Sequence, residues 1–94
     1  MISTQDAVHR VAISVNQRGL HDRAAALFAR AAGQFEAEVT IASTAEQVSA
    51  LSIMGMLMLG ASIGTELQFN ARGSDAKDAV DALALLFESG FKEE

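Results

Sequence analysis

A histidine and an arginine two residues apart stand where a helix is predicted to begin. His21 comes directly before, and Arg23 within, the first turn of an amphipathic helix predicted over 22–32. The backbone N–H groups of a first turn lack intrahelical partners, and the helix dipole is positive there, so an anion can be held. A neutral imidazole has one ring nitrogen with a free lone pair. His21 could therefore accept a phosphoryl group and pass it on, with the guanidinium of Arg23 binding phosphate oxygens.

Two further charges bear on this chemistry. Asp22 directly follows His21 and is predicted to be the N-cap of the helix, since aspartate is a favoured capping residue. Its carboxylate should also repel an incoming phosphate, and it could pair with Arg23. Arg18 either adds positive potential or is a solvated loop residue. We therefore expect Asp22 to alter transfer kinetics or partner preference, with loss of transfer as the alternative.

Hydrophobic periodicity predicts four strands and three helices. Apolar residues alternate with polar or small ones in three segments, and a short strand lies between the second and the third: 11–15, 38–41, 47–49 and 66–71. In the first strand, Val11, Ile13 and Val15 form the apolar face. Helices are predicted over 22–32, 51–59 and from 76 to the residue before Gly90.

The element order is therefore β-α-β-β-α-β-α in a single domain over 1–94. We expect an α+β fold, a two-layer open-faced sandwich in which three helices cover one face of a four-stranded sheet. The other face is expected to be partly solvated. The last helix should have Ser74 or Asp75 as its N-cap and bury one apolar stripe, made of Ala76, Val80, Leu83 and Phe87.

The predicted helix over 51–59 is apolar on more than one face. A helix on a single sheet can bury only one face, and exposed apolar groups often mark an interface. We assign Met56 and Leu59 to the core and Ile53, Met54 and Leu57 to a partner interface. Ser52 stands at the start of this helix, where its default role is a cap.

Composition excludes several classes of protein. The chain has 94 residues, no cysteine and a formal net charge of −5, which argues against thiol chemistry and against binding nucleic acid. Its two histidines are far apart, so we expect no metal and no cofactor. The longest apolar run, 53–61, is too short to span a bilayer, and residues 1–6 lack the pattern of a signal peptide. Four arginines in the first third predict a basic patch around His21, namely Arg10, Arg18, Arg23 and Arg30.

Four short motifs follow one another at family spacing. They are Gly19-Leu20-His21-x-Arg23, Ala50-Leu51-Ser52-Ile53-Met54-Gly55, Gly64-Thr65-Glu66-Leu67 and Gly73-x-Asp75-Ala76. With the element order, they resemble HPr, the histidine-containing phosphocarrier of the bacterial phosphotransferase system, over nearly the whole chain. The Met-rich stretch over 53–59 is more similar to proteobacterial HPr and its nitrogen-branch relative NPr than to the sugar carriers of Gram-positive bacteria. Asp22 and Ala24 depart from the family, which usually has a small or hydroxyl residue and a proline at these positions.

The resemblance implies a cytoplasmic carrier that takes phosphate on Nδ1 of His21 from enzyme I and passes it to an enzyme IIA-type acceptor. Such a protein is a phosphoryl-transfer intermediate rather than a freestanding enzyme. The resemblance also implies a kinase or phosphatase acting on Ser52. We expect a monomer with no membrane insertion. The rival hypothesis is a regulatory interaction module in which Asp22 impairs transfer and phosphorylation of Ser52 controls binding. A small-molecule-binding domain ranks last.

Overall fold

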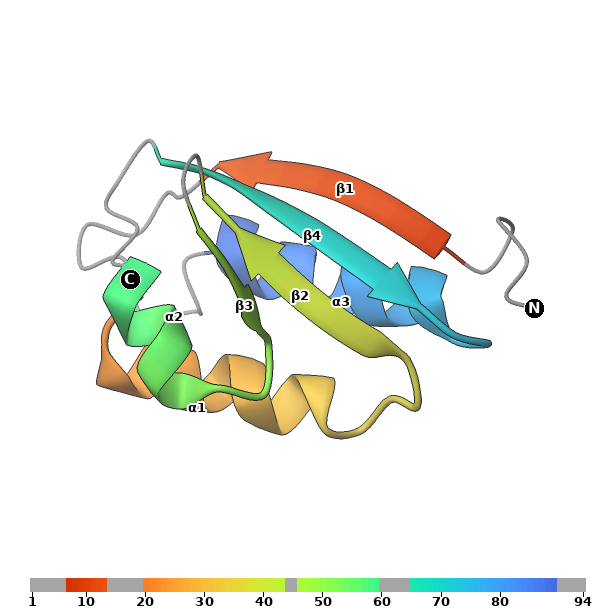
Figure 1. The fold of residues 1–94 in the computed structure, drawn as a ribbon, viewed down its shortest axis with the longest axis horizontal. Coiled ribbons are helices and arrows are strands. Elements are labelled where there is room, and N and C mark those ends of the chain that lie inside the picture. The colour runs from red at the N-terminus through yellow and green to blue at the C-terminus, as the bar shows by residue number, and fades with distance from the viewer. Residues whose placement is uncertain (1–6, 14–19, 44–45, 60–64, 90–94) are drawn as a thin grey trace.

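The computed structural model describes residues 7–13, 20–43, 46–59 and 65–89. Its elements follow the predicted order β-α-β-β-α-β-α (Figure 1). They are β1 (Ala7–Ile13), α1 (Asp22–Ala32), β2 (Glu38–Ala42), β3 (Gln47–Ser49), α2 (Ile53–Leu59), β4 (Glu66–Arg72) and α3 (Ala76–Glu88). None of the helices within these ranges is long and apolar enough to cross a membrane.

The four strands form one antiparallel sheet in the order β1-β4-β2-β3. The long C-terminal strand β4 therefore lies between β1 and β2, and Figure 1 shows the helices together on one side of the sheet. This arrangement confirms the predicted open-faced sandwich. Helices α1 and α3 run in opposite directions beneath the sheet, with the start of α1 near the end of α3.

Three phenylalanines hold the two layers together. Phe28 of α1, Phe69 of β4 and Phe87 of α3 are fully buried, and their ring centroids lie 5.9–6.1 Å apart. Two of the three pairs are edge-to-face, the arrangement that aromatic quadrupoles favour. Since each ring comes from a different element, the cluster fixes both long helices against the centre of the sheet.

The predicted limits of α1 and the buried stripe of α3 are confirmed, but the inward face of β1 was predicted wrongly. Val11 and Ile13 are 39% and 51% exposed, whereas Ala12 is 2% exposed. Side chains alternate between the two faces of a strand. An alternation predicted one residue out of register therefore assigns every side chain to the wrong face. Val15 lies outside the described residues.

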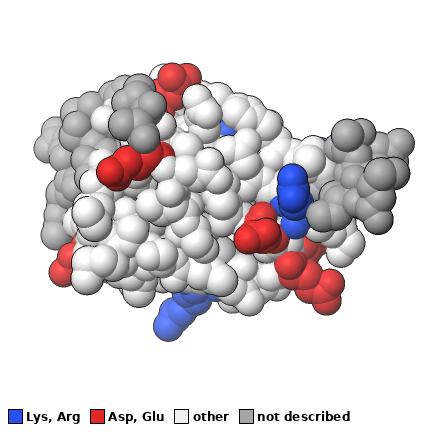
Figure 2. Space-filling model, viewed as in Figure 1, with Lys and Arg blue, Asp and Glu red and all other residues white. Residues whose placement is uncertain are grey.

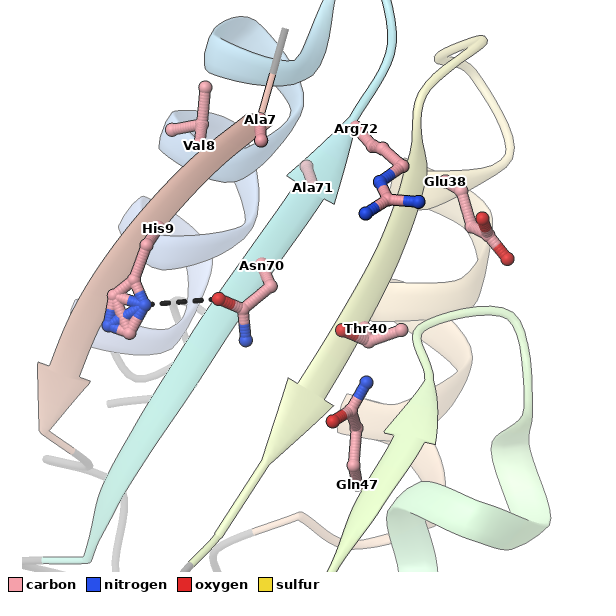
Figure 3. A pocket seen from close by; sticks show the side chains of 9 residues that line it. All are labelled: Ala7, Val8, His9, Glu38, Thr40, Gln47, Asn70, Ala71 and Arg72. Atoms are coloured by element: carbon pink, nitrogen blue, oxygen red, sulfur yellow. Dashed lines mark hydrogen bonds between the residues drawn. The ribbon is translucent and has the colours of Figure 1, made fainter. Parts of the chain in front are cut away.

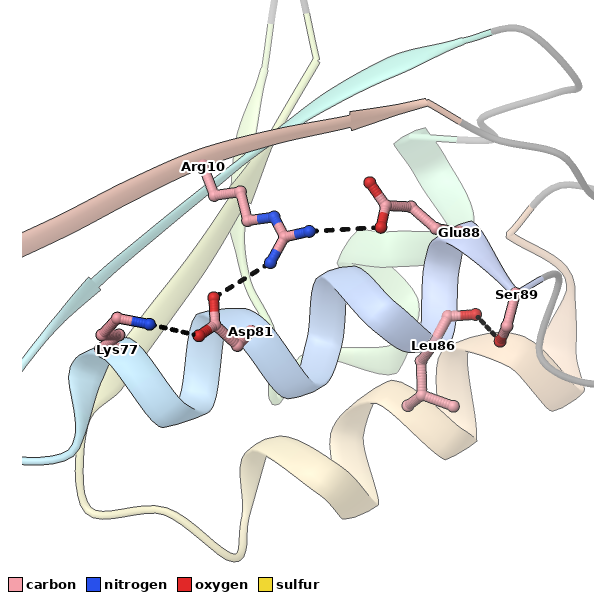
Figure 4. A network of polar contacts seen from close by, with 6 residues as sticks. All are labelled: Arg10, Lys77, Asp81, Leu86, Glu88 and Ser89. Carbon is pink, nitrogen blue, oxygen red and sulfur yellow. Dashed lines mark hydrogen bonds and ion pairs between the residues drawn. The ribbon is translucent and has the colours of Figure 1, made fainter.

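Arg10 explains this choice of face. It is half-buried on the same side of β1 as Ala12, facing α3, and its guanidinium binds Asp81 at 3.0 Å and Glu88 at 3.3 Å. Lys77 binds the other oxygen of Asp81 at 2.8 Å (Figure 4). An arginine can bury its aliphatic stem while its charged end pairs with carboxylates at the rim of the core. Arg10 can therefore face inward, and Val11, which was predicted to face inward, points to the other side of the sheet.

The start of α3 is held by hydrogen bonds to a neighbouring turn rather than by a cap on its own first turn. Asp75 occupies the N-cap position, one of the two alternatives predicted, but its side chain makes no capping hydrogen bond. Instead its two carboxylate oxygens accept hydrogen bonds from the backbone N–H groups of Glu36 and Ala37, at 2.9 and 2.8 Å. Gly73 has φ 136°, and a Cβ there would lie 2.9 Å from the Cα of Ala37. Asp75 and Gly73 thus join the turn before α3 to the turn before β2.

Substituting Asp75→Ala tests this connection. It removes the acceptor of two backbone N–H groups, and hydrogen bonds to a charged group contribute about 1.5–3 kcal/mol each. Because the site is partly exposed, water can hydrogen-bond to the freed N–H groups and restore part of this stabilisation. We therefore expect the free energy of unfolding to fall by about 2 kcal/mol in urea titration. Asp78→Ala removes a carboxylate from the same helix without these bonds. An equal loss in both variants would contradict the assignment.

The ion pairs of Asp81 predict a pH dependence. The hydrogen bond from Lys77, aided by that from Arg10, holds the pKa of the Asp81 carboxyl below its ordinary value of 3.8. A carboxyl with a lowered folded-state pKa stabilises the fold above its unfolded-state pKa, and this is lost as the pH falls through the folded-state value. We expect wild type to lose more stability than Asp81→Asn between pH 7 and pH ~3 in urea titrations. The side chains of Arg10 and Asp81 are 39% and 42% exposed, so the difference is expected to be small. Equal losses would show that the pairs contribute nothing.

Candidate functional site

His21 is the N-cap residue of α1. Its backbone is extended, with φ −85° and ψ 179°, and its carbonyl accepts a hydrogen bond from the N–H of Ala25 at 2.9 Å. The residue is half-buried, and its side chain makes no capping bond to the first turn. Leu20 on one side and Ala24 and Ala25 on the other are buried. The neighbours thus anchor the helix start in the core while the imidazole keeps access to solvent.

Two opposite charges follow the histidine in the first turn. Asp22 and Arg23 are the first two residues of α1, and both are exposed. The prediction that Asp22 is the N-cap was one residue out, because His21 takes that place. A carboxylate in the first turn is favoured by the helix dipole and a cation is slightly disfavoured. The dipole therefore gives no reason for an arginine at this position, which is available to bind an anion.

The basic patch predicted around His21 does not form among the described residues. Arg10 is engaged by the acidic residues of α3, and Arg30 lies in the last turn of α1, roughly 12 Å along the helix axis from its start. Arg18 lies outside the described residues. On the face drawn in Figure 2, charged side chains are scattered over a mostly uncharged surface. Arg23 is the cation that the described structure places at the histidine.

The helix α2 packs against α1 and begins with the predicted serine cap. The Oγ of Ser52 accepts a hydrogen bond from the N–H of Gly55 at 3.0 Å, and the carbonyl of Ser52 accepts one from Met56 at 3.0 Å. A Cβ on Gly55 would come within 3.0 Å of the Cβ of Val48 and 2.9 Å of that Oγ. The glycine thus permits a close approach of α2 to Val48 of β3. The helix starts at Ile53, two residues later than predicted.

Exposed apolar side chains gather on the outer side of α2. Ile53 and Met54, assigned to an interface from the sequence, are 43% and 70% exposed. Leu57 was predicted in the same set, but it is half-buried and packs against the core. Met58 is 71% exposed instead. We call Leu51, Ile53, Met54 and Met58 the apolar α2 surface.

Helix geometry explains the exchange of Leu57 for Met58. Met56 is fully buried, as predicted, and therefore marks the inward direction of α2. At about 100° per residue, Met54 and Met58 point roughly opposite to Met56, whereas Leu57 lies only about 100° away from it. Reading the sequence outward from Met56 would have found Met58. Leu59, predicted in the core, is half-buried and packs against it.

The second histidine lies on the open face of the sheet. His9 is exposed on β1, and its Nδ1 lies 3.0 Å from Oδ1 of its cross-strand neighbour Asn70, which accepts the hydrogen bond (Figure 3). A shallow concavity lies around this pair, between the start of β1 and the start of β2. Its polar side chains come from four strands and do not converge on one point. Within the described residues, no three His, Asp or Glu side chains gather as a metal site requires.

Comparison with known proteins places this geometry in a family. Residues 8–89 match the family model described as "PTS HPr component phosphorylation site". The chain is 40% identical over 79 residues to phosphocarrier protein HPr of Cupriavidus necator, covering 84% of this chain and 89% of that protein. It is 40% identical over 78 residues to phosphocarrier protein NPr of Shewanella violacea, covering 83% and 86%.

The fold agrees with solved structures of these proteins. HPr-C-His from Thermoanaerobacter tengcongensis superposes with a TM-score of 0.86 at 38% identity, covering 93% of this chain and 98% of that one. An HPr from Bacillus anthracis gives a TM-score of 0.82 at 34% identity, covering 86% and 96%. With a family model matched over residues 8–89 and relatives of about 40% identity along most of its length, the chain belongs to the HPr family.

Proposed function

We propose that this chain is a phosphocarrier of the phosphoenolpyruvate-dependent phosphotransferase system. His21 accepts a phosphoryl group from phosphorylated enzyme I and passes it to an enzyme IIA-type acceptor. The observation that carries the proposal is the placement of His21 in a chain of this family. It is the extended, half-buried N-cap of α1, with an exposed arginine two residues on.

The chemistry needs little more than positioning and charge. The lone pair of an imidazole nitrogen attacks phosphorus, the bond between phosphorus and the donor breaks, and its electron pair stays on the donor. Family resemblance implies that Nδ1 is the accepting nitrogen. Phosphoryl transfer proceeds with charge spread over three oxygens, so donors aimed at those oxygens stabilise the transition state. Arg23 supplies such donors, and the first turn of α1 adds the positive end of a helix dipole.

The sugar and nitrogen branches of the system both fit. The HPr and NPr relatives reported above are each 40% identical to this chain. Both names say phosphocarrier, and they favour the carrier over the rival regulatory module. We expect the protein to act in the cytoplasm as a monomer, because an exposed apolar α2 surface next to α1 must stay free to dock a donor and then an acceptor. No cofactor is needed for a transfer between two side chains.

Regulation at Ser52 is a further part of the proposal. Ser52 is half-buried at the start of α2, directly before Ile53 and Met54 of the apolar α2 surface. A phosphate on its hydroxyl would add about two negative charges beside a surface that docks by apolar contact. A kinase acting on Ser52 would therefore weaken binding of an acidic partner.

The Ser52 hypothesis is tested by Ser52→Asp. We expect about a tenfold weaker affinity for enzyme I, since a charge at an apolar interface loses hydration on docking; calorimetry measures it. Ser74→Asp, on an exposed turn, is the matched control and should bind like wild type. Unchanged binding of Ser52→Asp would end the hypothesis.

The carrier function is tested by phosphotransfer from labelled phosphoenolpyruvate through enzyme I. We expect acid-labile, alkali-stable label on wild type and a loss of at least ~10³-fold in His21→Ala, because the nucleophile is gone. His9→Ala removes the other histidine, which is bonded to Asn70 on the open sheet face, and should be labelled like wild type.

Two outcomes would contradict the proposal. Label that persists in His21→Ala would place the phosphoryl group elsewhere. An unlabelled wild type that still binds enzyme I would favour the regulatory module.

A further inference from the structure

We propose that Asp22 makes phosphorylated His21 a stronger phosphoryl donor, by destabilising the phosphorylated form of the protein relative to the free form. The inference rests on the proposed function and concerns the free energy of the phosphorylated form rather than the identity of the nucleophile. In this proposal Asp22 does not react itself. The negative charge of its carboxylate sets how readily His21 gives up the phosphoryl group.

The backbone places the carboxylate beside whatever the imidazole carries. His21 is the N-cap and Asp22 the first residue of α1, so their side chains leave adjacent points of one helix start. Adjacent Cα atoms are about 3.8 Å apart and both side chains are short, so the Asp22 carboxylate lies within about 11 Å of a phosphoryl group on the ring, and roughly 7 Å is the middle of the range that the two side chains allow. Asp22 is exposed, and no hydrogen bond or ion pair to another described residue draws its carboxylate away.

The charge of Asp22 offsets that of the neighbouring cation. Arg23 attracts the phosphoryl oxygens, but Asp22 and Arg23 together leave the first turn of α1 without net side-chain charge. Arg10 binds Asp81 and Glu88 against α3, and Arg30 lies at the far end of α1. In the described structure, therefore, a phosphoryl group on His21 meets one adjacent cation and one adjacent anion.

Coulomb's law sets the size of the effect. A charge of −1 and a charge of −2 about 7 Å apart in water repel enough to shift an equilibrium roughly sevenfold. Salt screening, with a Debye length of about 8 Å at physiological ionic strength, reduces this to about twofold. The free form has no phosphoryl charge, so this repulsion is present in the phosphorylated form alone.

The consequence follows from the balance of the two transfers. In the first, an N–P bond forms on His21 and the donor keeps the electron pair of the broken bond. In the second, that N–P bond breaks, its electron pair returns to the imidazole and the phosphoryl group joins the acceptor. Asp22 raises only the state between them, so it disfavours loading and favours delivery by the same factor.

The test measures the loading equilibrium rather than the rate. Wild type, Asp22→Asn and Asp78→Asn are equilibrated with enzyme I at fixed phosphoenolpyruvate and pyruvate, and phosphorylated and free protein are separated on a native gel. Asp78→Asn makes the same charge change in the first turn of α3, which Figure 1 shows at the opposite end of the molecule from the start of α1.

We expect Asp22→Asn to raise the ratio of phosphorylated to free protein about three- to sevenfold at low salt and about twofold at 0.15 M. Asp78→Asn should match wild type. An unchanged ratio for Asp22→Asn, or an equal rise in both variants, would overturn the inference and leave the carrier function intact. If neither wild type nor Asp22→Asn is phosphorylated, the carrier function fails, and the inference fails with it.

Discussion

The contact of Phe28, Phe69 and Phe87 is the constraint on which the rest of the structure depends. These fully buried rings join α1, the central strand β4 and α3. The sheet alone could not hold a helix in one orientation, since apolar burial is non-directional. Interlocking rings with edge-to-face contacts select one orientation of α1. The direction of that helix in turn decides where its N-terminal residue, His21, is presented.

Charges in this protein divide into those that hold the fold and those that remain at the site. Arg10 and Lys77 are used within the β1–α3 contact, and Asp75 joins two turns through backbone amides. The positive charges of Arg10 and Lys77 are therefore offset by carboxylates of α3. Asp22 and Arg23 remain exposed at the start of α1. Among the residues that the structure describes, one pair of opposite charges therefore shapes the site, and a small change in that pair is expected to change its behaviour.

Helices and most strands could be predicted because their periodicity reports burial directly. The limits of α1, the inward residues of β2 and β4, and the stripe of α3 all follow from apolar spacing. The face of β1 could not be predicted, because the inward Arg10 is satisfied by acidic partners 71 and 78 residues away in the chain, at Asp81 and Glu88. Exposure along α2 follows from the buried Met56, because Met58 rather than Leu57 lies opposite it on the helix, and the prediction did not use that geometry.

The site itself was predictable only in part. The position of His21 at a helix start follows from the local pattern, but the identity of the N-cap was one residue out. The engagement of Arg10 by Asp81 and Glu88 needed the fold, whereas the place of Arg30 at the far end of α1 already follows from the predicted helix over 22–32. Family resemblance supplied the role of the histidine, and the structure supplied its setting: an extended N-cap anchored by buried Leu20, Ala24 and Ala25.

The most direct test of the account is to locate the phosphoryl group in the phosphorylated protein. The chain has two histidines, so ¹⁵N labelling of both rings with ³¹P–¹⁵N correlation NMR distinguishes them. We predict a coupling from phosphorus to a single ring nitrogen of His21, with the ring signals of His9 unchanged. A coupling to His9, or to neither ring, would contradict the central claim that the start of α1 is where this protein carries phosphate.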